Sequence, residues 1–134
     1  MSQENVEIVL EGFRRFQAGD LRWADGWVHP EIEWDFSAYP LADLPTVGRG
    51  RTALLGVIET YMSGWRDLRQ EITEVIDAGD DVLVVIHETA GLRGSDAVLE
   101  RDVSHLWTVE DGVWTRWRLY ATREEAFEAA GLRE

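Results

Sequence analysis

The stretch that decides the fold runs from residue 81 to residue 121, "DVLVVIHETAGLRGSDAVLERDVSHLWTVEDGVWTRWRLYA". It contains three runs rich in β-branched and aromatic residues, separated by "LRGSD" (92–96) and "DG" (111–112). Both separators are typical of turns between antiparallel neighbours, because Gly, Asp and Ser adopt the backbone angles that tight turns need. The stretch therefore predicts a meander of three strands, over residues 81–91, 97–110 and 113–121.

Two further strands are predicted on the N-terminal side of this meander. "RQEITEVID" (69–77) is followed by another turn signal, "GDD" (79–81), and adds a strand to the series. "IEWDFS" (32–37) alternates apolar and polar side chains, which is the pattern of a half-buried strand. Residues 37–50 are predicted to form a loop.

Helices are predicted where apolar residues recur every three or four positions. Three such segments lie in the N-terminal half, over residues 2–19, 20–28 and 51–65. Thr122 and Glu125 form a capping box for a short C-terminal helix. Three helices over one face of a strongly curved, mostly antiparallel sheet give a cone-shaped α+β fold with a hollow between its layers. The length of 134 residues fits a single domain, residues 1–134.

The charge balance excludes several classes of partner. Thirteen basic and 26 acidic residues give a formal net charge of −13, which repels nucleic-acid phosphates and anionic lipid headgroups. The chain has no cysteine, and it has no run approaching the roughly 18 apolar residues that a membrane helix needs. Its N-terminus lacks the basic and apolar regions of a signal peptide. These features predict a cytoplasmic protein that binds neither nucleic acid nor membranes.

Three segments carry a resemblance to a known family: "FQAGDLRWADGWVHPEIEW", "VGRGRTAL" and "DGVWTRWRLYATREEAFEAAGL". With the order of elements, they resemble the nuclear transport factor 2-like superfamily, and within it the SnoaL-like group. The resemblance covers nearly the whole chain. It implies a cavity between the concave sheet face and the helices, and a homodimer through the outer sheet face. It does not name an activity, because this fold hosts isomerases, cyclases, dehydratases, hydrolases and proteins without catalysis.

Known chemistries of the superfamily map only partly onto this sequence. Alignment with ketosteroid isomerases puts the position of their tyrosine at Gly12, of their aspartate base at Phe36 and of their proton donor at His105. Asp35 is next to the base position, but strand alternation turns it to the opposite face. The resemblance to limonene-epoxide hydrolases puts their catalytic acid at Leu119. Only His105 retains a group that can transfer a proton.

His105 and Arg101 are the candidate catalytic residues. Alternation along the strand places both on one face, together with Trp107. An imidazole with an ordinary pKa near 6.5 can act as acid or base, and an arginine can hold an enolate or carboxylate oxygen. SnoaL-type polyketide cyclases, which close a ring by an aldol step, need such enolisation. The alternatives are a structural buried histidine and an arginine that pairs at the surface.

Aromatic residues are the candidate ligand-binding residues, because seven tryptophans exceed what a core of this size needs. We expect the cavity to be lined by Trp34, Phe36, Tyr61, Trp65, Trp107 and Trp117. Trp114 alternates to the opposite face from Trp117, with Arg116, Arg118 and Tyr120, and is predicted to lie on the dimer surface.

Periodicity leaves one orientation open and predicts no metal site. Residues 82–86 are apolar on both faces, so either His87 or Glu88 can face inward. The three histidines, His29, His87 and His105, lack the spacing of metal ligands, and no cofactor is predicted. Three hypotheses remain for the function, and in the first two the ligand is a small hydrophobic compound with a carbonyl or carboxylate group. They are an isomerase, cyclase or dehydratase using His105, a non-catalytic binder, and an interaction protein whose hollow is filled by tryptophans.

Overall fold

The computed structural model describes residues 2–18, 20, 24–39 and 44–132. Four helices and six strands occur among them, and their bounds in chain order are α1 (Ser2–Gln17), α2 (Ala24–Trp27), β1 (Val28–Asp35), β2 (Val47–Arg49), α3 (Arg51–Ser63), β3 (Trp65–Ala78), β4 (Asp81–Leu92), β5 (Val98–Glu110), β6 (Val113–Tyr120) and α4 (Arg123–Ala129). The strands form one sheet in the order β2-β1-β6-β5-β4-β3. All neighbours are antiparallel except β1 and β6, which run parallel.

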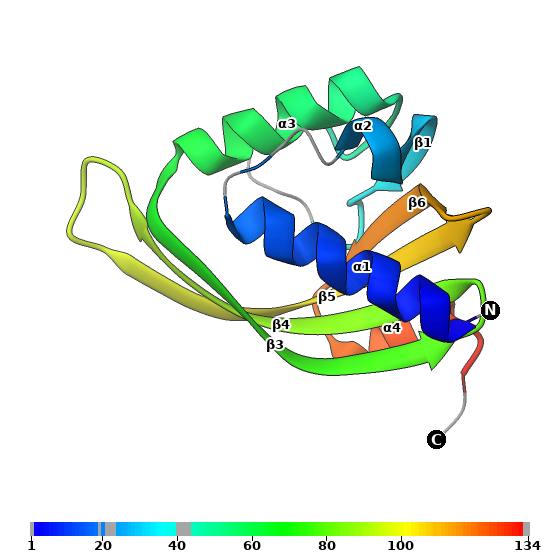
Figure 1. The fold of residues 1–134 in the computed structure, drawn as a ribbon. Coiled ribbons are helices and arrows are strands. Elements are labelled where there is room, and N and C mark those ends of the chain that lie inside the picture. The colour runs from blue at the N-terminus through cyan, green and yellow to red at the C-terminus, as the bar shows by residue number, and fades with distance from the viewer. Residues whose placement is uncertain (1, 19, 21–23, 40–43, 133–134) are drawn as a thin grey trace.

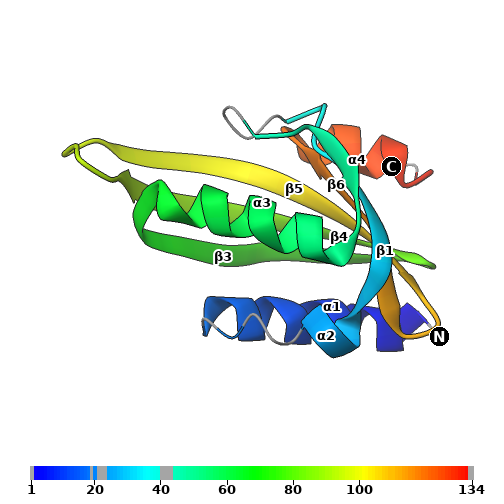
Figure 2. The same ribbon diagram turned by 90° about the horizontal axis from the view of Figure 1, so that it is seen from above.

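The predicted α+β fold is confirmed. Figures 1 and 2 show α1 and α3 over the concave face of the curved sheet, and α4 behind the opposite face. The main core fills the space between α1, α3 and the concave face, and includes Val9, Leu54 and Trp107. A smaller core lies behind the sheet, where Ala126 of α4 packs with Leu83 and Leu106. No described helix is long and apolar enough to span a membrane.

Several boundaries differ from the predicted ones. The structure adds the short strand β2 within the predicted loop, where it pairs with the end of β1. Strand β1 begins at Val28, four residues before the predicted strand. Its second residue, His29, directly precedes Pro30, and the residue before a proline disfavours the helical conformation. Trp65, predicted as the end of a helix, is the first residue of β3, since Gly64 ends α3. Gly19, the predicted end of the first helix, lies outside the described residues.

A β-bulge in β6 changes which side chains face the cavity. Trp117 pairs with Trp107 and Arg116 pairs with Thr108, but the next pair joins Trp114 to Val109. Thr115 is therefore an extra residue in β6, and the alternation of faces shifts by one position there. Trp114 consequently lies on the concave side and is 2% exposed. The prediction that Trp114 lies on a dimer surface is wrong for this reason.

Two helical glycines have opposite surroundings, which gives a first prediction. A Cβ added at Gly12 in α1 would lie 2.6 Å from Cη2 of Trp114, whereas a Cβ at Gly56 in α3 would meet nothing within 4 Å. Alanine favours a helix over glycine by about 1 kcal/mol. We expect Gly56→Ala to raise the free energy of unfolding by about 0.5–1 kcal/mol. We expect Gly12→Ala to lower it by about 1–3 kcal/mol, because the buried indole must move.

Urea denaturation followed by far-UV circular dichroism measures both changes. The two variants control for each other, because each makes the same chemical change within a helix. If Gly12→Ala stabilises the protein as Gly56→Ala does, Trp114 does not pack against α1 as described.

Candidate functional site

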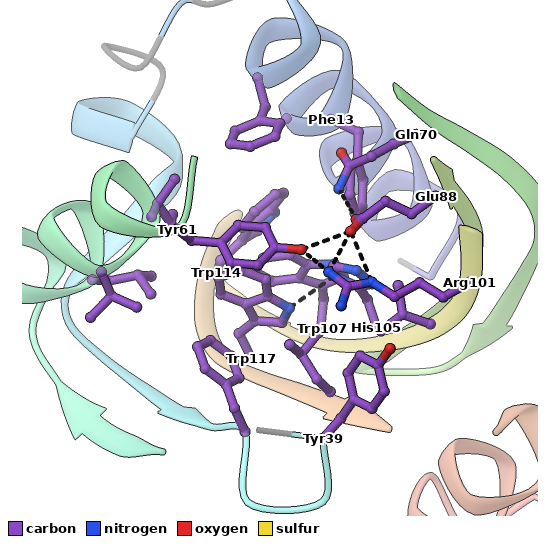
Figure 3. A pocket seen from close by; sticks show the side chains of 18 residues that line it. Phe13, Tyr39, Tyr61, Gln70, Glu88, Arg101, His105, Trp107, Trp114 and Trp117 are labelled. Atoms are coloured by element: carbon purple, nitrogen blue, oxygen red, sulfur yellow. Dashed lines mark hydrogen bonds and ion pairs between the residues drawn. The ribbon is translucent and has the colours of Figure 1, made fainter. Parts of the chain in front are cut away.

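A cavity lies between the concave sheet face and helices α1 and α3. The space between its lining residues is about 770 Å³, a figure that includes the open solvent at its mouth. Most of its wall is apolar, and the tryptophans Trp107, Trp114 and Trp117 line it together (Figure 3).

Six of the eight residues predicted to form the site line this cavity. They are Phe36, Tyr61, Arg101, His105, Trp107 and Trp117. The cavity is also lined by Gly12 and Leu119, so the positions aligned with the catalytic groups of ketosteroid isomerases and epoxide hydrolases do meet at one site. Two of these positions carry an apolar side chain, Phe36 and Leu119, and Gly12 has none.

Trp34 and Trp65 do not line the cavity. Trp34 is buried, but its ring lies against Gly48 of β2, where an added Cβ would be 2.6 Å from Cη2. Strand β2, which was not predicted, thus packs against this indole at the edge of the sheet. Trp65 begins β3 and is half-buried, with its ring centroid 5.5 Å from the Arg101 guanidinium carbon. It supports Arg101 from outside the cavity wall.

The polar groups of the cavity are concentrated at one end (Figure 3). Arg101 donates from Nη2 and Nε to Oε1 of Glu88, at 2.7 and 3.1 Å. The Tyr61 hydroxyl donates to the same oxygen at 2.7 Å, and Gln70 donates from Nε2 to Oε2 at 2.9 Å. Arg101 also donates to the Tyr61 hydroxyl. One carboxylate, one guanidinium, one phenol and one amide form a single connected cluster.

The environment of this cluster is largely apolar. The Glu88 residue is 4% exposed, and burial raises the pKa of its carboxyl group, while the hydrogen bond from Gln70 acts in the opposite direction. The guanidinium of Arg101 also lies over the rings of Tyr39 and Tyr61, at 5.6 and 5.8 Å. Aromatic faces attract a cation, so they add to the ion pair in fixing Arg101.

His105 lies beside this cluster and next to the indoles of Trp107 and Trp117. Trp117 donates from Nε1 to Nδ1 of His105 at 3.0 Å, so the ring proton of the neutral imidazole is on Nε2. The imidazole is nearly parallel to Trp107 and Trp117, with interplanar angles of 24° and 20°. Burial and the charge of Arg101 lower the pKa of His105 to about 3. His105 is therefore neutral at pH 7 and offers an N–H donor, which differs from the titration near pH 6.5 expected of an unperturbed imidazole.

This low pKa gives a prediction on acid stability. Between pH 6.5 and pH 3 the unfolded chain binds a proton at His105 and the folded chain does not, so stability falls as the pH falls. His105 alone lowers the free energy of unfolding by about 2 kcal/mol between pH 7 and pH 5. We expect His105→Gln to lose that part of the pH dependence. Urea denaturation at each pH measures it.

His87 provides the matched control, because its surroundings act in the opposite direction. It lies on the outer face, with Nδ1 2.8 Å from Asp102 and Nε2 3.0 Å from Glu100. The hydrogen bond to Asp102 is the main cause that raises the pKa of His87. The protonated His87 therefore stabilises the fold below pH 6.5, and this contribution is lost at higher pH. His87→Gln should therefore leave the acid loss in place. An identical pH profile for wild type and His105→Gln would contradict a neutral buried imidazole.

The orientation left open by periodicity is now determined. Glu88 faces the cavity, and His87 faces outward. Asp35 also lies outside the cavity lining, where hydrogen bonds from Ser37 lower the pKa of its carboxyl group. Among the described residues no group of three or more His, Asp or Glu side chains is arranged to hold a metal ion.

The sequence left the orientation of Glu88 open, and Gln70 was not predicted as a site residue. A signal for Glu88 existed in the turn "LRGSD", because counting back along the hairpin pairs Gly91 with Val98 and Glu88 with Arg101. Opposite charges directly across two strands stabilise a sheet and indicate a shared face. Gln70 lies within the predicted strand 69–77, but its pairing with Glu88 across β3 and β4 has no mark within that strand.

A curved sheet with helices on its concave face, and a cavity with one polar end, define a class of small cavity-containing α+β domains. The family model of the SnoaL-like domain matches residues 9–117, and the chain belongs to this family. The match confirms the resemblance found in the sequence.

Solved structures show the same fold. An NTF2-like protein of unknown function from Burkholderia pseudomallei K96243 is 17% identical, with a TM-score of 0.78, covering 93% of this chain and 95% of its own. A protein named as a SnoaL-like polyketide cyclase, from Jannaschia sp. CCS1, is 21% identical, with a TM-score of 0.75, covering 96% and 91%. TerC, co-crystallised with polyporic acid, is 21% identical, with a TM-score of 0.75, covering 96% and 98%. No curated protein matches the chain.

Proposed function

We propose that this protein binds a small, mostly apolar molecule carrying a carbonyl or carboxylate oxygen, with that oxygen at the Arg101 end of the cavity. The observation that carries the proposal is the distribution of polarity in the cavity. Apolar and aromatic side chains make up most of the wall, and the polar groups converge on the cluster of Arg101, Tyr61, Glu88 and Gln70. Such an arrangement buries the body of a ligand and fixes its orientation through one functional group.

The donors at this end suit an oxygen acceptor. Nη1 of Arg101 makes no hydrogen bond to any described residue, and Nε2 of His105 carries the ring proton. Both side chains project from the same face of β5, four residues apart. The co-crystallisation of TerC with polyporic acid supports a small organic molecule as the ligand. The cytoplasmic location and the homodimer stay predictions.

A catalytic role is the second candidate, and Glu88 is the residue that favours it. Among the described residues that line the cavity, Glu88 is the one carboxylate, and burial favours its taking up a proton. In this candidate Glu88 accepts a proton from the carbon next to the ligand carbonyl, while Arg101 and His105 stabilise the enolate oxygen. Return of the proton to another carbon gives isomerisation. His105 then serves as a neutral donor, and the base expected from the sequence is replaced by Glu88.

The binding proposal is tested by titration calorimetry with three compounds that share the naphthalene ring system. These are naphthalene, 2-acetylnaphthalene and 2-naphthoate. At least one oxygen-bearing compound should bind more tightly than the hydrocarbon, and Arg101→Gln should remove that advantage. Arg49→Gln is the matched control, because Arg49 forms an exposed ion pair with Glu33. Absence of binding for all three compounds would overturn the proposed function.

The catalytic candidate has a separate readout. We expect the methyl protons of bound 2-acetylnaphthalene to exchange with deuterium from heavy water faster in the presence of the protein, as followed by proton NMR. Glu88→Gln should abolish the acceleration. Binding without accelerated exchange would leave the non-catalytic binder as the function.

A further inference from the structure

The net charge of the cavity lining decides which of the two oxygen classes the cavity prefers. Among the described lining residues Arg101 is the one permanent cation and Glu88 is the one carboxylate. His105 is neutral, because Trp117 donates to its Nδ1 and the indoles and Phe13 enclose it. The lining is therefore electrically balanced before any ligand enters.

The charge of Arg101 is compensated within the protein. Two of its nitrogens donate to Oε1 of Glu88, and the side chain of Glu88 is 5% exposed. Tyr61 and Gln70 donate to the two carboxylate oxygens and hold the carboxylate in place. Because Arg101 is 26% exposed and Glu88 only 5%, water screens the pair only in part, and a second negative charge nearby would be largely uncompensated.

Taking the proposed function as its basis, we propose that Glu88 is a specificity-determining residue, and that the cavity selects uncharged planar carbonyl compounds, such as aryl ketones, and rejects their carboxylate counterparts. A neutral carbonyl oxygen can accept from Nη1 of Arg101 or Nε2 of His105 without adding a charge. An anion at the same place would compete with Glu88 for Arg101 and lie close to a fixed carboxylate.

The shape of the wall supports a planar ligand. The rings of Trp107 and Trp117 are stacked with centroids 4.4 Å apart and an interplanar angle of 12°. With the nearly parallel imidazole of His105, they form a group of nearly parallel rings in the cavity wall, contributed by two adjacent strands. Flat aromatic faces favour conjugated, planar partners through offset stacking.

Titration calorimetry at pH 8, where 2-naphthoate is fully ionised, tests the inference with isosteric ligands. The wild-type protein should bind 2-acetylnaphthalene and 2-naphthamide more tightly than 2-naphthoate, by about tenfold or more. Glu88→Gln keeps the shape but removes the negative charge, so the preference should shift toward 2-naphthoate by about tenfold or more. Glu33→Gln is the control, because it removes an exposed carboxylate from an ion pair on β1 and should leave the preference unchanged.

The possible outcomes separate this inference from the proposed function. Binding of no compound overturns both. Equal or tighter binding of 2-naphthoate by the wild type overturns the inference and leaves the proposed function standing. A wild-type preference for the neutral compounds that Glu88→Gln does not change overturns the role of Glu88. The wild-type comparison needs no variant, so a Glu88→Gln protein that folds poorly still leaves the selection of neutral ligands tested.

Discussion

Replacing Trp114 by alanine is expected to lower the free energy of unfolding by about 3–5 kcal/mol. The indole is 2% exposed, its ring centroid lies 3.9 Å from that of Trp107, and it fills the space above Gly12. Removing it leaves a cavity between α1 and the sheet that neighbouring side chains fill only in part. Urea denaturation followed by the fluorescence of the remaining tryptophans measures the loss.

Arg116→Ala is the matched control, because Arg116 lies two residues away on the same strand and is exposed on the outer face. Its replacement should change stability by less than about 0.5 kcal/mol. Sedimentation of both variants distinguishes the two interpretations of Trp114. If Trp114→Ala alters the oligomeric state at unchanged stability, Trp114 lies at a subunit surface and the bulge at Thr115 does not turn it inward.

Replacing Glu88 by alanine is expected to cost about 3–5 kcal/mol, because it leaves the charge of Arg101 in an apolar site without its partner. The side chain of Arg101 is 26% exposed, so partial contact with water places the expected loss toward the lower end of that range. Tyr61 and Gln70 also lose the acceptor to which they donate. Chemical denaturation at pH 7 measures the change.

The double variant Glu88→Met with Arg101→Met tests the cause of this loss. Two apolar side chains of similar length replace the pair without leaving a charge, so the double variant should recover most of the lost stability. A double variant as unstable as Glu88→Ala would show that packing around the carboxylate, and not the unpaired guanidinium, determines the cost.

Much of the fold follows from local patterns in the sequence. The strands of the meander were predicted to within a few residues at most of their ends, because turn residues and alternation act over short distances. Strand β2 was missed, since a strand of three residues is too short to show a periodicity. The bulge at Thr115 was also missed, because it depends on the pairing of β6 with β5 and has no mark of its own in "VWTRW".

The candidate site was predicted in the same uneven way. Alternation from His105 correctly placed Arg101 and Trp107 on the face that lines the cavity, because β5 is regular across these positions. Glu88 was left undecided, since Val82, Leu83 and Val84 on the same strand are all fully buried, between two different cores. The low pKa of His105 depends on enclosure by Phe13 from α1, which no local pattern on β5 contains.

The parallel pairing of β1 with β6 has a consequence for the order of folding. Strands β3 to β6 are joined by short turns, whereas the pairing of Trp34 with Trp117 joins two strands that lie far apart in the sequence. Closing so long a loop has a larger entropic cost, and non-local contacts of this kind slow folding. We expect the meander to form first and β1 to dock last. The cavity would then gain Phe36 and become complete only in the final step of folding.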